Sequence, residues 1–221
     1  MKINFLRKFF ILYKLTLKNY SLLRIIQVIF VKELNVEGAS LDVGSKKSIT
    51  NVTNYLRNTN LTYLDKFSRD PNDLCIDLEN FPNSVTDKYK NIFLFNVLEH
   101  IKNYDNCLKN IYNFLEKDGI FYGSTPFLYK IHQSPNDYFR YTKQLLQTCL
   151  ESNGFKNIKI QVIGFGLFTC IYNLTFDLFK KIPGLNVILL TICLILDKLI
   201  YFFTKNYKEL YPIGYIFTAA K

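Results

Sequence analysis

The sequence contains no tryptophan and is poor in acidic side chains, with 18 Asp and Glu against 28 Lys and Arg. The formal charge of +10 favours an anionic partner, such as a nucleic acid or an acidic membrane surface. A dedicated nucleic-acid site would show a dense arginine cluster with interleaved aromatic residues, and the sequence has none. Lysine-rich composition also follows from AT-rich coding alone, so we do not expect nucleic acid as a partner.

The five cysteines form no Cys-x-x-Cys pair, are widely spaced and are odd in number, which argues against a disulfide framework. Most of them lie among apolar residues, so we expect buried thiols and no metal site. An apolar run near the N-terminus, FFILYKL, is interrupted by Lys14 and followed by no small-residue cleavage site. These features predict a cytoplasmic protein.

From residue 39 onward, short apolar runs alternate with helical patterns, which is typical of a doubly wound, mostly parallel α/β sheet with helices on both faces. The stretch 91–98 is too continuously apolar to have a wet face, so it is expected to be central and parallel. Helices are expected over 49–56, from Asp105 to Gly119, and after Thr142. The seven expected strands cover residues 39–44, 61–65, 73–78, 91–98, 119–126, 157–164 and 211–220.

Two segments lie outside this alternation of strands and helices. The first is a prefix, residues 1–35, which precedes the domain formed by residues 36–221. In the prefix, apolar residues recur at spacings of three and four beside several lysines and arginines. Such a basic amphipathic helix can lie on an anionic membrane or cap the core of the following domain, and both interpretations stand.

The second segment is an apolar insertion within the domain, at about 166–210. Its run LNVILLTICLIL has about a dozen apolar residues before Asp197 and Lys198, against the roughly 20 that a membrane span needs. We expect a helical hairpin, buried in protein or resting in the membrane interface, rather than a crossing.

Polar and small residues stand at the ends of the first four strands, where parallel sheets bind ligands. Gly44 would let the backbone approach a ligand, and Asp65 would accept hydrogen bonds from ribose hydroxyls. A carboxylate beside an apolar residue, Asp77, suits the amino group and ring of adenine. The candidate cofactor residues are Asp42, Gly44, Ser45, Asp65, Asp77, Leu78 and Asn96.

Several of these stretches resemble class I S-adenosylmethionine-dependent methyltransferases. LDVGS is similar to the first motif of that family, CIDLENFP to its adenine segment, and FNVLEHI to its motif after the fourth strand. The stretch PFLYKIHQSPNDYFRYT resembles a branch associated with sugar and surface-polysaccharide biosynthesis. The resemblance, over about 39–166 and the last strand, implies a Rossmann-like fold and S-adenosylmethionine as cofactor. It implies a small-molecule, sugar or lipid-linked glycan as methyl acceptor.

The first-motif loop departs from the family, because two lysines follow Gly44 where most relatives carry another glycine. Dinucleotide loops need several glycines to seat a pyrophosphate, which makes this loop poor for NAD. S-adenosylmethionine carries no phosphate, so Gly44 with Ser45 suffices, with Lys46 or Lys47 near its carboxylate. A degenerate loop is the alternative, and it favours an inactive scaffold that shares the fold.

His132, Asp137 and Arg140 follow the fifth strand and are the candidate catalytic residues on the acceptor side. Methyl transfer to a hydroxyl needs a base, which a histidine or aspartate can supply, and an arginine can grip a phosphate or carboxylate. Alternatively, Asp137 and Arg140 form a structural ion pair. His100 is expected to orient the nearby helix start or to form part of the site wall, and Glu99 is expected to be a helix-start charge. Besides methylation of a small molecule or glycan and an inactive scaffold, RNA methylation is a third possible function. It is favoured by the net charge alone.

Overall fold

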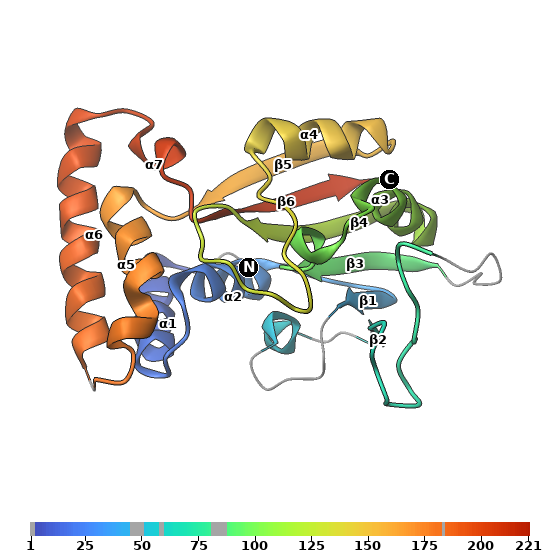
Figure 1. Ribbon diagram of the computed structural model, residues 1–221, viewed down its shortest axis with the longest axis horizontal. Helices are drawn as coiled ribbons and strands as arrows, with labels where there is room; N and C mark the ends of the chain where they lie inside the picture. Colours follow the sequence, from blue (N-terminus) through green and yellow to red (C-terminus); the bar gives the residue numbers. More distant parts are fainter. Residues whose placement is uncertain (1–2, 45–50, 58–59, 81–87, 183) are drawn as a thin grey trace. The chain divides into compact units, whose positions relative to one another are not determined.

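The computed structural model describes residues 3–44, 51–57, 60–80, 88–182 and 184–221 (Figure 1). The chain divides into two compact units, which are described separately. The helical unit comprises Met1–Leu34, Pro126–Lys130 and Val162–Tyr215. The sheet unit comprises Asn35–Thr125, Ile131–Gln161 and Ile216–Lys221.

A six-stranded sheet with the order β2-β1-β3-β4-β6-β5 organises the sheet unit. β1 pairs in parallel with both β2 and β3, and β3 pairs in parallel with β4. β6 runs antiparallel to β4 (Figure 1), and the Lys221 amide donates to Gly119 O near the start of β4. The strands are β1 Ser40–Val43, β2 Leu61–Leu64, β3 Tyr89–Phe95, β4 Leu115–Pro126, β5 Lys156–Ile163 and β6 Gly214–Ala220.

β3 lies inside the sheet and parallel to its neighbours, as its continuous apolar sequence predicts. Ile92, Phe93 and Leu94 have no exposed surface. A strand buried on both faces needs apolar side chains on both, and this explains the absence of alternation.

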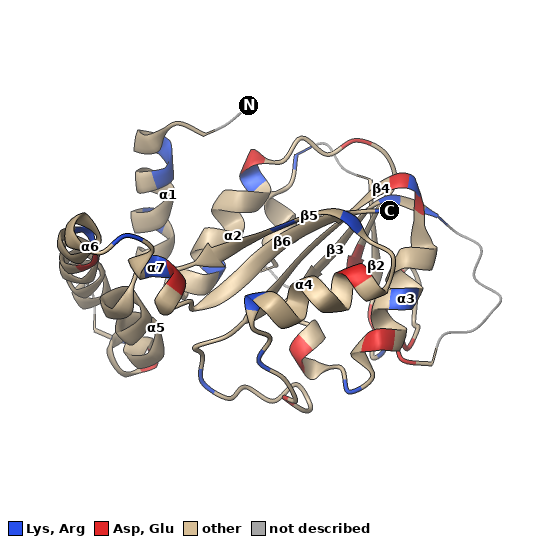
Figure 2. Cartoon of the chain, turned by 90° about the horizontal axis from the view of Figure 1, so that it is seen from above, with Lys and Arg blue, Asp and Glu red and all other residues tan. Residues whose placement is uncertain are grey.

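The helices α3, Tyr104–Phe114, and α4, Lys143–Ser152, pack side by side on one face of the sheet (Figure 2). The Thr142 hydroxyl accepts from the Leu145 amide at 3.2 Å, which confirms the expected cap of α4. Asn103, rather than Asp105, caps α3. The helix also ends earlier than expected, because β4 begins at Leu115.

Two expected elements are wrong. Among the described residues the sheet has six strands, because the expected strand 73–78 makes only an isolated bridge between Leu64 and Leu74. Its acidic side chains accept hydrogen bonds from nearby residues instead, such as the Glu79 amide on Asp77 at 3.0 Å. The expected helix 49–56 is a single 3₁₀ turn, η1, Val52–Tyr55, and its first two residues lie outside the described part of the chain.

The helical unit brings the two N-terminal helices together with the helices that lie between β5 and β6. In this unit α1 packs on α2 and α6, and α5 packs on α2 and α6. The Tyr13 hydroxyl lies 3.0 Å from the Thr191 hydroxyl, which joins α1 to α6. The helices are α1 Phe5–Leu17, α2 Leu22–Glu33, α5 Leu167–Phe179, α6 Leu185–Phe203 and α7 Tyr207–Leu210.

Asp197, in the middle of α6, is buried and caps the N-terminus of α5. Its carboxylate accepts from the Phe168 and Thr169 amides, both at 2.9 Å, and from the Tyr207 hydroxyl at 3.2 Å. The residue before α5 is Gly166, which has no side chain to cap with, so the cap comes from a distant helix. Hydrogen bonds from the helix amides therefore compensate the free-energy cost of burying the Asp197 carboxylate.

We expect Asp197→Ala to lower the free energy of unfolding by about 2 to 4 kcal/mol, because two helix amides and a hydroxyl lose their acceptor. The matched control is Lys198→Ala, a neighbouring exposed position, which should change stability by less than about 0.5 kcal/mol. Urea unfolding followed by circular dichroism measures both. Equal effects of the two substitutions would contradict the capping role.

Candidate functional site

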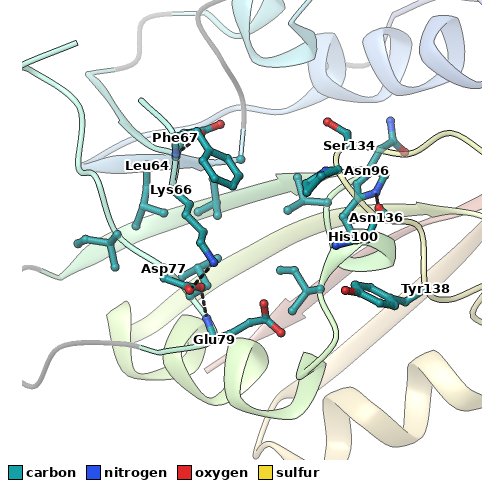
Figure 3. Close-up of a pocket in the computed structure, with 18 residues that line it drawn as sticks. Leu64, Lys66, Phe67, Asp77, Glu79, Asn96, His100, Ser134, Asn136 and Tyr138 are labelled. Carbon is teal, nitrogen blue, oxygen red and sulfur yellow. Dashed lines mark hydrogen bonds and ion pairs between the residues drawn. The ribbon is translucent and has the colours of Figure 1, made fainter. Parts of the chain in front are cut away.

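A cavity of about 560 Å³ opens at the carboxyl ends of β1, β2 and β3 (Figure 3). Its lining includes five of the seven candidate cofactor residues: Gly44, Asp65, Asp77, Leu78 and Asn96. Parallel pairing explains this convergence, because it brings the ends of neighbouring strands to one edge of the sheet. The volume lies within the roughly 300 to 1,000 Å³ typical of small-molecule sites.

Gly44 occupies a position that only glycine fits well. Its φ is +74°, and a Cβ there would lie 2.6 Å from Val97 Cγ2. Its amide donates to Leu64 O at 2.7 Å, which holds the end of β1 against β2. The next candidate, Ser45, lies outside the described residues.

Asp42 is not brought to the cavity. Its buried carboxylate accepts from the Asn51 side chain at 2.8 Å and from the Thr53 hydroxyl. Asp42 therefore joins β1 to η1. A cofactor contact by Asp42 stays a prediction from the sequence, with these hydrogen bonds as its observed surroundings.

One wall of the cavity carries a lysine that sequence reasoning missed. Lys66 Nζ donates to Asp77 Oδ2 at 2.6 Å (Figure 3). Burial raises the pKa of Asp77, but the hydrogen bonds from Lys66 and the Glu79 amide outweigh it, so the net pKa is lowered. Asp65 accepts from the Phe67 amide at 2.7 Å. The missed signal was the position of Lys66, directly after a strand-end aspartate.

The opposite wall comes from the turn after β3 and from residues 134–138. Asn96 has a φ of +56°, a backbone region that asparagine tolerates, and its side chain accepts from the Ser124 hydroxyl at 3.2 Å. His100, Asn136 and Tyr138 complete this wall (Figure 3).

The three candidate catalytic residues lie close together, and none of them lines this cavity. Arg140 holds Asp137 through both guanidinium nitrogens, with Nη2 to Oδ2 at 2.7 Å. The His132 amide donates to the same carboxylate at 3.0 Å. The hydrogen bond from Arg140 lowers the pKa of Asp137 to about 2. The ion pair allowed by the spacing is thus formed, while catalysis by the three residues stays a prediction.

Glu99 is the acidic residue in the first turn of a 3₁₀ helix, and it is fully buried. This helix is η2, Leu98–His100. Its Oε1 lies 3.5 Å from His132 Nε2 and 3.7 Å from His100 Nε2. The structure thus adds Glu99 and His100 to the surroundings of His132.

We expect the Asp137–Arg140 pair to stabilise the loop. The Asp137 side chain is only 2% exposed, so removal of Arg140 would leave it as an unpaired buried charge. Asp137→Ala, Arg140→Ala and the double substitution form a cycle measurable by chemical unfolding. The expected coupling is about 1 to 3 kcal/mol. Additive effects would show that the pair contributes no stability.

The structure resembles solved methyltransferases at low sequence identity. A possible histamine N-methyltransferase from Thermotoga maritima has 14% identity and a TM-score of 0.55, with 95% of this chain and 92% of that chain covered. The 1,6-didemethyltoxoflavin-N1-methyltransferase of Burkholderia thailandensis has 14% identity, a TM-score of 0.55, and 90% and 78% coverage. These likenesses show a shared fold.

A third structure is the Haemonchus contortus phosphoethanolamine N-methyltransferase 2, with 13% identity and a TM-score of 0.51. The comparison covers 89% of this chain and about half, 51%, of that one. No curated protein matches the chain. Residues 17–160 match the family described as "Methyltransferase domain", and because this match spans more than half of the sequence, the chain belongs to that family.

Proposed function

We propose that this protein transfers the methyl group of S-adenosylmethionine to a sugar or lipid-linked glycan acceptor on the cytoplasmic side of a membrane. S-adenosylmethionine is the cofactor, in keeping with the methyltransferase family of the chain. Related folds have been solved in complex with S-adenosylmethionine or S-adenosylhomocysteine. The resemblance of residues 126–142 to sugar-modifying relatives supports the acceptor class.

The observation that carries the proposal is that Gly44, Asp65, Asp77, Leu78 and Asn96 line one cavity. In the proposed complex the amino-acid end of the cofactor approaches Gly44, where a bare backbone allows close contact. Asp65 accepts from the ribose hydroxyls. Asp77 and Leu78 meet the adenine amino group and ring.

We propose that the methyl acceptor binds beside the loop that contains His132. Methyl transfer breaks the bond between sulfur and the methyl carbon, forms a carbon–oxygen bond and releases the hydroxyl proton. Asp137 is a weak base, because Arg140 engages both of its oxygens and lowers its pKa to about 2. His132 is therefore the member of this group that would act on the acceptor.

We expect Asp65→Asn to weaken S-adenosylhomocysteine binding by about tenfold to a hundredfold, because a charged acceptor of two ribose hydroxyls is lost. The matched control is Asp118→Asn, an exposed residue outside the cavity, which should bind like the wild type. Titration calorimetry measures both. Absence of heat and of any melting shift for the wild type would favour the inactive scaffold.

A second part of the proposal is contact with an anionic membrane through α1 and α6. On α6 the exposed apolar residues recur at helical spacing and include Ile188, Ile192, Ile195 and Leu199, ending at Phe202, which is 83% exposed. Exposed apolar residues on α1 lie beside exposed basic residues, which complement anionic lipid headgroups; the basic ones are Arg7, Lys14 and Lys18.

Among the described helices, α6 is long and apolar enough to cross a membrane, with a mean hydropathy of 2.1. Length and composition do not separate a span from a helix that lies in the interface. The buried Asp197 on α6 and its partners on α5 favour a helix packed within the helical unit, which lies on the membrane surface.

We expect the protein to float with phosphatidylglycerol vesicles. The double substitution Phe202→Ser and Phe203→Ser should abolish flotation, because it removes the apolar contact. Lys14→Glu with Lys18→Glu should weaken flotation mainly at low salt, because salt screens this term. Leu145→Ser, at an exposed apolar position on α4, is the control. Flotation unaffected by either pair would contradict the proposed surface, and resistance to alkaline carbonate would indicate a span.

A further inference from the structure

We propose that Glu99, His100 and His132 form a binding site for a divalent transition-metal ion. Glu99 and His100 belong to η2, directly after β3, and His132 lies on the segment after β4. The chain has two histidines, and both are in this cluster. The site goes beyond the proposed methyl transfer, which by itself requires no metal.

The donor atoms are spaced as metal ligands are. One ring nitrogen from each histidine and one oxygen of Glu99 all lie within 4.8 Å of one another. Ligands about 2.1 Å from a tetrahedral ion are separated by roughly 3.4 Å. Glu99 Oε1 lies 3.5 and 3.7 Å from the two Nε2 atoms, so a small closure brings the three donors around one ion.

The second nitrogen of each histidine faces an oxygen, as in most metal-binding histidines. His100 Nδ1 contacts Asn136 O, and because a carbonyl only accepts, Nδ1 must carry the hydrogen. In the neutral ring Nε2 is then a lone pair directed toward Glu99. His132 Nδ1 lies 3.6 Å from Asp137 Oδ2, whose position Arg140 holds. The Nε2 atoms of both rings lie near the same oxygen, Glu99 Oε1.

The environment of Glu99 supports the site independently of the spacing of the donor atoms. Its side chain has no exposed surface, and neither carboxylate oxygen has a hydrogen-bond partner among the described residues. A buried carboxylate whose oxygens accept no hydrogen bond is strongly unfavourable. The distances from the two Nε2 atoms exceed those of N–H···O hydrogen bonds, so imidazole protons would compensate it poorly. An ion between the three donors compensates the charge at the observed spacing.

The donor set selects the class of ion. Two imidazoles and one carboxylate suit zinc, cobalt, manganese or iron, whereas calcium and magnesium prefer oxygen ligands alone. Three protein ligands leave a coordination position for a water or hydroxyl oxygen. His100 also lines the cavity, which places the proposed ion behind that wall.

The test uses the full chain without a polyhistidine tag, stripped with chelator and dialysed. We expect calorimetry to show one equivalent of Zn²⁺ bound, and Glu99→Gln and His132→Ala to weaken binding at least tenfold. Glu151→Gln, an exposed carboxylate, and Cys75→Ser, an exposed thiol, are controls that should bind like the wild type. Circular dichroism of the metal-free proteins checks folding.

A second measurement needs no variant. Co²⁺ added to the wild type should shift the ring signals of both histidines in proton NMR, and its absorption should lack a thiolate charge-transfer band. Absent Zn²⁺ binding, wild-type affinity in Glu99→Gln, or dependence on Cys75 would each overturn the proposal, as would unshifted histidine signals. S-adenosylhomocysteine binding by the metal-free protein is measured separately, so failure of the cofactor site is distinguishable from failure of the metal site.

Discussion

Parallel pairing of β3 with β1 and β4 is the constraint on which the candidate site depends. β1 pairs in turn with β2, so the chain leaves β1, β2 and β3 at one edge of the sheet. Gly44, Asp65 and Asn96 are far apart in sequence and line one cavity because of this pairing. Parallel strands require crossover connections, and the turns that begin them carry the polar groups.

Buried carboxylates hold both local turns and segments that are distant in the sequence. Asp42 accepts from Asn51 and Thr53, Asp137 from Arg140, and Asp197 from the first amides of α5. In each case donors from the surrounding residues compensate the charge, as low-dielectric burial requires. Glu99 differs, because the described residues offer its oxygens no hydrogen bond. This contrast is what distinguishes a structural carboxylate from one suited to hold an ion.

Much of the fold could be predicted where local sequence and tertiary environment agree. The apolar run of β3 specified a central strand, and Thr142 specified the start of α4, because a side-chain cap acts within three residues. Residues 73–78 were wrongly predicted as a strand, because an apolar pattern does not show whether a pairing edge is available. Local acceptors such as Asp77 took the backbone amides instead.

The sequence by itself determined the alternation of strands and helices, and with it the strand-end residues that line the cavity. Only the tertiary structure decided the burial of Asp42, the capping of α5 by Asp197, and the meeting of Glu99 with His100 and His132. The physical reason is range. Periodicity and caps from a neighbouring side chain act over a few residues. The contacts named above join segments up to about 30 residues apart, and their proximity depends on how the whole chain packs.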